Sequence, residues 1–523
     1  MKKLSTLAAA LLLSCGIASA NTLRWAAQND IQTLDPHSQN HSATTTISGY
    51  AYEGLTRYTE KFDVEPALAT KWTFVSPTQV RFDLRRGVKF HDGTPFTADD
   101  VVFSLQRIKH PASNMVIYSS GIKEVKKIDD FTVDLILDGP NPVLTRNLTF
   151  VRIVSKAWAI KNRSENPQDY KAKEDTFASR NANGTGPFKI TSWTPDQKLT
   201  MTANKDWWDK PKGNISEVTY LPIKQDATRV AALLSGALDL LTDLPPQDVA
   251  KLKADPRLKV IEGPENRTIF FALDLGSDEI KGSNVKGKNP FKDRRVREAM
   301  SLAIDREAIK RSLMRNLSIP AAIMVAPVAY GWSQELDTVA KPDLARAKQL
   351  MTDAGYAEGF ETPLACPNDR YVNDGRICQT VAANLSRINV KINLAAETKG
   401  TYFPKVLRRD TSFYMLGWTP TTYDSHNALN ALMICPDDKT GAGQFNLGAY
   451  CNPKLDELTK KILVETDKPK RDAMIKEAFE VHTADVGHLP LHQQALAWGV
   501  SKKVKLVQMA DNYMPFKWIT VSK

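Results

Sequence analysis

Alternating hydrophobic and polar positions dominate the first half of the chain and predict strands. Val80, Phe82 and Leu84 alternate with polar neighbours, as in a strand with one buried face. Similar alternation or extended apolar runs predict further strands at Thr22 to Ala26, Thr132 to Leu137 and Val218 to Ile223. Residues 22 to about 265 are therefore expected to form a strand-rich region with short helices.

Hydrophobic positions in the following region recur at helical spacing. One predicted helix, Asp293 to Leu313, places these side chains near one face: Val296, Met300, Ala303, Ile304 and Leu313. Two more helices are predicted, one over Leu344 to Ala354 with Gly355 as its stop, and one through Ile377 and Ile388 before a strand at Lys391 to Leu394. This alternation of helices and strands indicates an α/β lobe.

The segment Arg86 to Arg107 combines a tight turn with a capped helix. Asp92-Gly93 supplies residues that tolerate a positive φ. Thr97 stands three residues before Asp100, which is the spacing of a helix N-cap. We interpret His91, beside the turn, as a structural hydrogen-bonding residue and not as a metal ligand.

The N-terminus has the pattern of an export signal. Lys2 and Lys3 precede an apolar run, and Ala18-Ser19-Ala20 offers small residues at the positions that a signal peptidase reads. An alternative interpretation makes Cys15 a lipidated residue that tethers the protein to a membrane. We favour cleavage after Ala20, since a predicted strand starts almost at once and leaves little tether, and we expect a periplasmic protein.

Four cysteines remain beyond the signal segment, namely Cys366, Cys378, Cys435 and Cys451. An even number in an exported chain is consistent with two disulfides, although four cysteines allow three connectivities. We expect sequential pairing, in which each bridge closes a short loop. A zinc site is the alternative, but neither pair has the close C-x-x-C spacing.

Composition and charge narrow the classes of function. With 523 residues, 42% hydrophobic and 25% charged, the chain suits a globular protein of two or three domains. The formal net charge of +11 would favour anionic ligands or a negative surface, yet the basic residues are scattered. No basic block interleaved with aromatic residues indicates nucleic-acid binding.

Catalytic motifs are absent from the sequence. It contains neither G-x-S-x-G nor H-E-x-x-H, and the glycine-rich Gly282 to Asn289 lacks the hydroxyl residue of a phosphate-binding loop. His482, His488 and His492 lie close in sequence and would suit a metal or metal chelate. Because a glycine and a proline flank them, we interpret them as unrelated histidines of a surface or hinge-proximal loop.

Five segments in order carry a resemblance to a known family: Arg86 to Arg107, Gly184 to Ile190, Asn204 to Trp208, Pro290 to Asp305 and Ala347 to Tyr356. They resemble motifs of the periplasmic solute-binding proteins that serve peptide-type ABC importers, the extracellular solute-binding proteins of family 5. The resemblance covers nearly the whole chain after the signal segment.

The resemblance implies a two-lobed periplasmic-binding-protein fold with a hinge. Lobe I is expected to comprise residues 21–265 plus 495–523, with a subdomain near 70–180, and lobe II residues 266–494. A monomer without cofactor or resident metal would enclose a solute between the lobes and present it to the permease subunits of an importer. A periplasmic enzyme or a sensor without a transporter is the alternative class of function.

Candidate ligand-binding residues follow an apolar strand at Phe413 to Leu416. The next ten residues lack helix or strand periodicity, and loops at the carboxyl ends of strands are where α/β lobes bind ligands. Trp418 would supply an apolar wall, and Thr421, Thr422 and Asp424 would supply polar contacts.

Comparison with the family refines these candidates. Peptide-binding relatives commonly carry an aspartate, which pairs with the peptide's amino terminus, where this chain has Thr421, whereas Asp424 matches a second acidic position of some relatives. Arg370 matches an arginine that binds the ligand carboxylate in dipeptide-binding members, a role suited to a guanidinium. His37, in the first turns of the opposite lobe, is a further candidate contact.

These residues predict a solute with a carboxylate or other anionic group and a weaker demand for a free α-amine. Modified or γ-linked peptides such as glutathione, opines and other amino-acid conjugates fit that description. Ordinary short peptides, nickel chelates and oligosaccharides stay open as alternatives.

Overall fold

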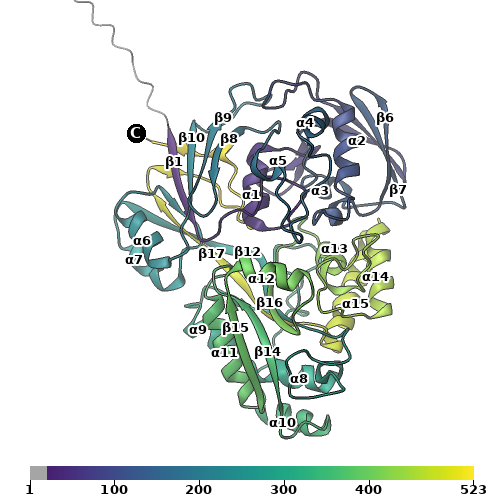
Figure 1. Ribbon diagram of the computed structural model, residues 1–523, viewed down its shortest axis with the longest axis vertical. Helices are drawn as coiled ribbons and strands as arrows, with labels where there is room; N and C mark the ends of the chain where they lie inside the picture. Colours follow the sequence, from purple (N-terminus) through teal and green to yellow (C-terminus); the bar gives the residue numbers. More distant parts are fainter. Residues whose placement is uncertain (1–20, 523) are drawn as a thin grey trace, which may run out of the picture.

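The computed structural model describes residues 21–522, which form two parts along the long axis of the molecule (Figure 1). One mixed sheet runs through both parts in the order β15-β14-β16-β12-β17-β11-β1-β10-β9-β8. The part that contains β1 is called lobe I and the part that contains β14 is called lobe II. The expected α/β fold is confirmed.

Lobe I is built on strands that the hydrophobic alternation predicted. Val218 and Tyr220 are buried while Thr219 between them is half-buried, as a strand with one core-facing side requires. The lobe I strands of the main sheet are β1 (Thr22–Ala27), β8 (Phe188–Thr194), β9 (Lys198–Ala203), β10 (Glu217–Pro222) and β11 (Leu240–Leu241). Helices α1 (Ser42–Ala51), α6 (Asp226–Leu234) and α7 (Val249–Lys253) also belong to this lobe.

A separate four-stranded sheet forms an outer subdomain of lobe I (Figure 1). Its strands, in spatial order, are β4 (Ala69–Ser76), β5 (Gln79–Leu84), β7 (Thr132–Leu137) and β6 (Ile122–Asp129). Helix α2 (Ala98–Arg107) packs on this sheet, and its capping box is confirmed because the N–H of Thr97 donates to the Asp100 carboxylate at 2.9 Å. His91 is structural, as predicted, with Nε2 lying 3.0 Å from the Gly186 carbonyl oxygen.

Lobe II alternates helices and strands. Its strands are β13 (Ile319–Pro320), β14 (Phe360–Pro367), β15 (Val390–Glu397) and β16 (Phe413–Trp418). Its first helices are α8 (Arg294–Ala303), α9 (Arg306–Ser312), α10 (Leu344–Asp353), α11 (Asp374–Ser386) and α12 (Lys399–Leu407). Helices α13 (Ser425–Ala428), α14 (Pro453–Val464) and α15 (Lys468–Asp485) pack together beside the subdomain (Figure 1).

The single helix predicted over Asp293 to Leu313 is wrong, because the chain breaks it into α8 and α9. Ile304 adopts an extended conformation, and the Asp305 carboxylate accepts the N–H of Ala308 at 2.8 Å. Asp305 therefore starts a new helix as its N-cap, and the continuous hydrophobic face hides this local signal.

Two long strands connect the lobes. The beginning of β12 (Leu258–Leu273) pairs with the end of β17 (Leu489–Ser501) in lobe I, and the end of β12 pairs with β16 in lobe II. The β12–β17 ladder is interrupted between Pro264 and Thr268. An interrupted ladder is the most easily bent part of such a connection.

Two disulfides confirm the sequential pairing. Cys366 at the end of β14 is joined to Cys378 in α11, and Cys435 is joined to Cys451. The first bridge therefore encloses the loop that carries Arg370.

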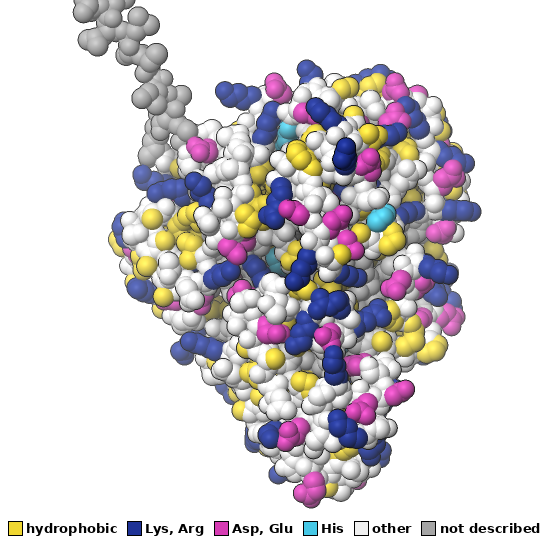
Figure 2. Space-filling view, viewed as in Figure 1, with side chains coloured by type: hydrophobic (Ala, Val, Ile, Leu, Met, Phe, Trp, Pro, Cys, Tyr) yellow, Lys and Arg dark blue, Asp and Glu magenta, His cyan; other side chains and the backbone are white. Residues whose placement is uncertain are grey.

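Basic and acidic side chains are intermixed over the face shown in Figure 2, without a continuous area of one sign. This distribution agrees with the scattered charges of the sequence and does not suit a nucleic-acid surface. Among residues 21–522, no helix has the length and apolar character needed to cross a bilayer. The shorter elements are β2 (Thr56–Tyr58), β3 (Val64–Pro66), α3 (Leu144–Asn147), α4 (Lys156–Lys161), α5 (Phe177–Arg180), β18 (Val504–Lys505) and β19 (Thr520–Val521).

Candidate ligand-binding site

Two adjoining compartments lie between the lobes, beside further cavities that residues of both lobes line. The first, here the arginine compartment, has a volume of about 70 Å³ and is lined by residues of both lobes, including Gln32, Asn40, His41, Arg370, Trp418 and Thr421. The second, here the aromatic compartment, has a volume of about 110 Å³ and is lined by residues including Tyr58, Phe150, Arg152, Trp207, Asp511 and Tyr513. Ser42, Thr45, Thr419 and Thr421 line both compartments and form their common boundary.

Among residues 21–522, Arg370 is the one charged side chain that lines the arginine compartment. The loop between β14 and α11 holds it in place, because the Asp374 carboxylate accepts the N–H groups of Arg370 at 2.8 Å and Tyr371 at 2.9 Å. Its side chain is buried, and its Nε has no hydrogen-bond partner in the described chain. Burial and the nearby Arg267 guanidinium lower the pKa of Arg370. An anion that entered the compartment would offset both the cost of burying the Arg370 charge and its repulsion by Arg267.

His41 faces the same compartment from the residue before α1, and sequence reasoning missed it. Its ring is buried with 6% of its surface exposed, and neither ring nitrogen has a partner in the described chain. Burial and the cations Arg370, Lys399 and Arg267 hold the pKa of His41 well below its usual range. His41 is therefore a neutral group with one donor and one acceptor free for a ligand.

Other polar atoms at this wall also lack partners. Within residues 21–522, Gln32 Oε1, Asn40 Nδ2 and Thr419 Oγ1 are buried without a hydrogen bond. Buried polar groups are normally hydrogen-bonded, so a concentration of unpaired ones around a cavity indicates a site for a polar ligand. This concentration identifies the arginine compartment as the candidate binding site.

Trp418 and Thr421 lie at and just after the carboxyl end of β16, the position at which ligand-binding loops are expected in an α/β lobe. Trp418 at the end of β16 lines the arginine compartment, and its Nε1 donates to the Asn427 side chain at 2.9 Å. Thr421 lines both compartments, and its hydroxyl oxygen lies 2.7 Å from the hydroxyl oxygen of Tyr118 in lobe I. Its carbonyl oxygen also accepts from Tyr58 of lobe I. Thr421 thus connects the two lobes directly.

Thr422 and Asp424 lie outside the lining of both compartments. The Thr422 carbonyl oxygen accepts from Arg146 at 3.4 Å. The Asp424 carboxylate accepts two hydrogen bonds from Arg471, at 2.8 and 2.9 Å, and caps α13. Asp424 is already paired as a structural residue, so it has no free charge for a ligand amine.

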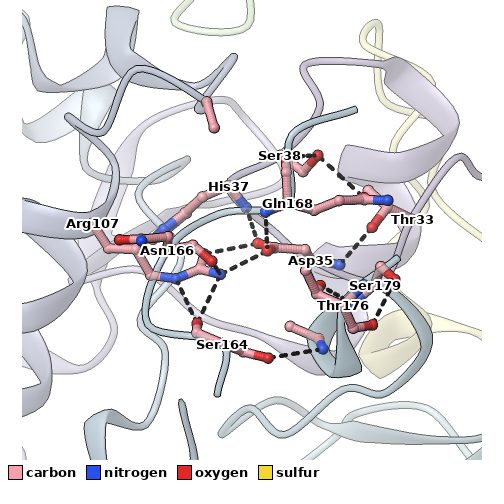
Figure 3. Close-up of polar contacts among 12 residues, drawn as sticks. Thr33, Asp35, His37, Ser38, Arg107, Ser164, Asn166, Gln168, Thr176 and Ser179 are labelled. Atoms are coloured by element: carbon pink, nitrogen blue, oxygen red, sulfur yellow. Dashed lines mark hydrogen bonds and ion pairs between the residues drawn. The ribbon is translucent and has the colours of Figure 1, made fainter. Parts of the chain in front are cut away.

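His37 also lies outside both compartments and belongs to a buried polar cluster of lobe I (Figure 3). Its Nε2 lies 2.8 Å from the Arg152 carbonyl oxygen, and its N–H donates to Asp35. Asp35 accepts two hydrogen bonds from Arg107, at 2.6 and 2.8 Å. Burial lowers the pKa of His37 to about 3. His37 therefore supports the fold of lobe I from within this buried cluster.

The interpretation of His482, His488 and His492 as a surface or hinge-proximal loop is wrong. His482 lies in α15 and His492 in β17, and all three rings are buried. His482 Nε2 lies 2.9 Å from His488 Nδ1. The helix-to-strand connection is buried because β17 is a central strand, and none of the three lines either compartment.

The fold, with two compartments between its lobes, is that of a class of proteins, the two-lobed solute-binding proteins. A structure of the binding protein AgaA in complex with agropinic acid, from A. tumefaciens R10, matches 96% of this chain and 99% of its own with a TM-score of 0.84 at 23% identity. This likeness concerns the fold.

Sequence comparison then identifies the family. The family model of the bacterial extracellular solute-binding proteins, family 5 Middle, matches residues 63–440, and the chain belongs to this family. Its relatives include heme-binding protein A of Haemophilus influenzae, 27% identical over 88% of this chain and 84% of that protein. They also include the dipeptide-binding protein of Escherichia coli K12, 26% identical over 85% of this chain and 83% of that protein. Members of this extracellular or periplasmic family bind solutes and deliver them to the permease of an ABC importer, and that is the role of this chain.

Proposed function

We propose that the chain captures a peptide or peptide-like solute by a carboxylate, which Arg370 binds in the arginine compartment. A free α-amine is not the main determinant of recognition. The observation that carries the proposal is the contrast between two charged groups. Arg370 faces the compartment with an unpaired Nε, whereas the Asp424 carboxylate is paired with Arg471.

The electrostatics of the compartment favour an anion. Lys399, behind the compartment wall, is buried, and burial lowers its pKa to about 8. Lys399, Arg267 and Arg370 all act on the same histidine, His41. Arg267 is paired with Glu265 at 3.0 Å, and neither Arg267 nor Lys399 lines the compartment. A ligand carboxylate would therefore accept its charge-assisted hydrogen bonds from Arg370, in a water-poor site where they are stronger than in water.

The names of the relatives support a small organic solute without fixing its identity. The Escherichia coli relative is named for dipeptides, the Haemophilus relative for heme, and the AgaA structure holds agropinic acid. A common fold with such different solutes implies that the residues lining the chamber set the specificity. A short peptide, a modified peptide or another amino-acid conjugate carries the carboxylate that Arg370 would bind.

Solute capture by lobe closure also needs a hinge and export. We place the hinge at the interrupted part of the β12–β17 ladder, so that residues 21–265 plus 495–523 close on residues 266–494.

The sequence supports export with cleavage after Ala20, and mass spectrometry of the mature protein should then find Asn21 as the first residue. A lipid on Cys15 would contradict this cleavage. Among residues 21–522, those that line the two compartments include no nucleophile paired with a base, and we assign binding without catalysis.

The experiment that tests the proposal is a thermal-shift screen of the protein that begins at Asn21. The ligands are peptides with free and with acetylated amino termini, glutathione, opines, sugars and nickel chelates. A ligand at a hundred times its Kd should stabilise the protein by about 2.7 kcal/mol. Stabilisation that persists after acetylation supports the proposal. Stabilisation only by free-amine peptides would overturn it.

A further inference from the structure

The aromatic compartment contains a second arginine without a carboxylate partner. Arg152 of lobe I is half-buried there, and its Nη1 donates to the Thr149 carbonyl oxygen at 3.0 Å. Within residues 21–522 its guanidinium forms no ion pair. Arg107 and Arg471 are buried outside both compartments and are each paired with an aspartate, Asp35 and Asp424. Arg306, also buried outside them, is held by backbone carbonyl oxygens instead.

The surroundings of Arg152 compensate for its charge only in part, through the nearby acids Glu53 and Asp511. The guanidinium lies 5.5 Å from the ring centroid of Phe150, and burial lowers the pKa of Arg152. Glu53 lines the same compartment, but three donors occupy its carboxylate, from Thr185 at 2.9 Å, Trp208 at 2.8 Å and Trp207 at 3.2 Å. A half-buried cation without an ion-pair partner would gain a partner from a ligand that supplies an anion.

Asp511 is the other acid at this wall. It accepts the N–H of Tyr513 at 2.9 Å, and burial raises its pKa to about 6. It does not form an ion pair with Arg152 in the described chain. An ammonium group beside a ligand carboxylate would find a partner in Asp511, so the compartment tolerates an amine without requiring one.

The two compartments are positioned to hold one molecule. They share Ser42, Thr45, Thr419 and Thr421 as lining residues, with Arg370 in one compartment and Arg152 in the other. The aromatic compartment, at about 110 Å³, is somewhat smaller than the ~150 Å³ apolar cavity that binds benzene. Its walls include the rings of Tyr58, Phe150 and Tyr513. These aromatic walls suit a flat ring or a short apolar segment of a ligand that ends in a polar group.

We infer that the solute is an elongated dicarboxylate, with one carboxylate bound by Arg370, an apolar or aromatic middle section, and a second carboxylate bound by Arg152. This inference rests on the proposed function and narrows its substrate class. Amino-acid conjugates with an acidic group at each end belong to that class.

Three matched probes test the inference by isothermal titration calorimetry. Hippurate carries one carboxylate and no amine, 4-carboxyhippurate adds a second carboxylate to the ring, and 4-carbamoylhippurate has the same shape without the second charge. We expect 4-carboxyhippurate to bind about tenfold or more tightly than the other two, since charge-assisted hydrogen bonds are the strong ones. Equal affinities of all three would overturn the inference while leaving the Arg370 proposal intact.

Variants then assign the effect to residues. Arg152→Met should abolish the advantage of 4-carboxyhippurate and leave hippurate unchanged, which also shows that the variant is folded. Gly49→Ala should act similarly, because the added Cβ would meet Arg152 Nη2 at 2.8 Å in the aromatic compartment alone. Arg370→Ala should weaken all three probes, and Arg387→Ala, an exposed arginine, should change none.

The outcomes distinguish a failure of the Arg152 inference from a failure of the Arg370 proposal. An undiminished advantage of 4-carboxyhippurate in Arg152→Met would overturn the role of Arg152. Failure of all three probes to bind, or binding that Arg370→Ala leaves unchanged, would overturn the proposed carboxylate anchor itself.

Discussion

At the scale of single residues, the chamber is marked by side chains whose polar atoms have no partner. His41 and Arg370 contribute such atoms at the arginine compartment, whereas the Asp424 carboxylate and His37 Nε2 have partners within their own lobes. Arg370 and Trp418 were predictable, since one matches a family motif and the other follows an apolar strand. His41 was not predictable, because a lone histidine before a helix carries no sequence signal of burial beside a cavity.

Thr421 gives a prediction at this scale. Thr421→Val keeps the shape of the side chain but removes the hydrogen bond to Tyr118 that joins the lobes. We expect solute affinity to fall about fivefold, since one hydrogen bond contributes about 1 kcal/mol to the closed state. Tyr118→Phe should give the same loss, and the double variant should lose no more than either single one. Additive losses in calorimetry would contradict a shared contact.

At the scale of elements, strands were more predictable than helix boundaries. The alternation at Val80, Phe82 and Leu84 corresponds to β5, because half-buried strands impose a period of two. The break between α8 and α9 was missed because both helices keep their apolar faces on one core, while Asp305 starts the second helix. The capping box at Thr97 was visible because its two partners lie three residues apart.

The two disulfides should differ in what they support. Each encloses a short loop, so replacing either pair by serine should lower the free energy of unfolding by about 3 kcal/mol in denaturant titrations. The Cys366–Cys378 bridge also encloses the loop of Arg370. Its removal should weaken solute binding more than removal of Cys435–Cys451, because the loop of Cys435–Cys451 contributes the apolar Phe445 and Leu447 to the lining of the arginine compartment and no charged side chain. Equal effects of both pairs on affinity would contradict the assigned role of the Arg370 loop.

At the scale of the whole molecule, buried neutral histidines make stability depend on pH. Burial lowers the pKa of His37, His488 and His492 to about 3 and that of His91 and His426 to about 4. Because the unfolded chain takes up these protons near pH 6.5 and the folded chain does not, stability is lost as the pH falls below that value. Each group costs about 1.4 kcal/mol per pH unit.

Buried acids act in the opposite direction, since burial raises the pKa of Asp30, Glu53, Asp100, Glu265, Asp337, Asp374 and Asp511. Burial raises the pKa of Asp374 and Asp511 to about 6, so the folded chain takes up their protons first and gains stability as the pH falls from about 6 to 4. The histidines begin to cost stability near pH 6.5, whereas Asp374 and Asp511 begin to add it only near pH 6, so the melting temperature should fall between pH 7 and 6. A melting temperature that stays constant or rises over this range in calorimetric scans would contradict the burial of the histidines.

The whole account depends on a solute carboxylate held between the lobes by Arg370. The most direct test is calorimetric titration of the best solute from the thermal-shift screen against its carboxamide, on the wild type, Arg370→Ala and Arg387→Ala. We predict that the wild type and Arg387→Ala bind the carboxylate at least about tenfold more tightly than the carboxamide. Arg370→Ala should bind both forms equally weakly. Equal affinity of the wild type for the carboxylate and the carboxamide would contradict the account.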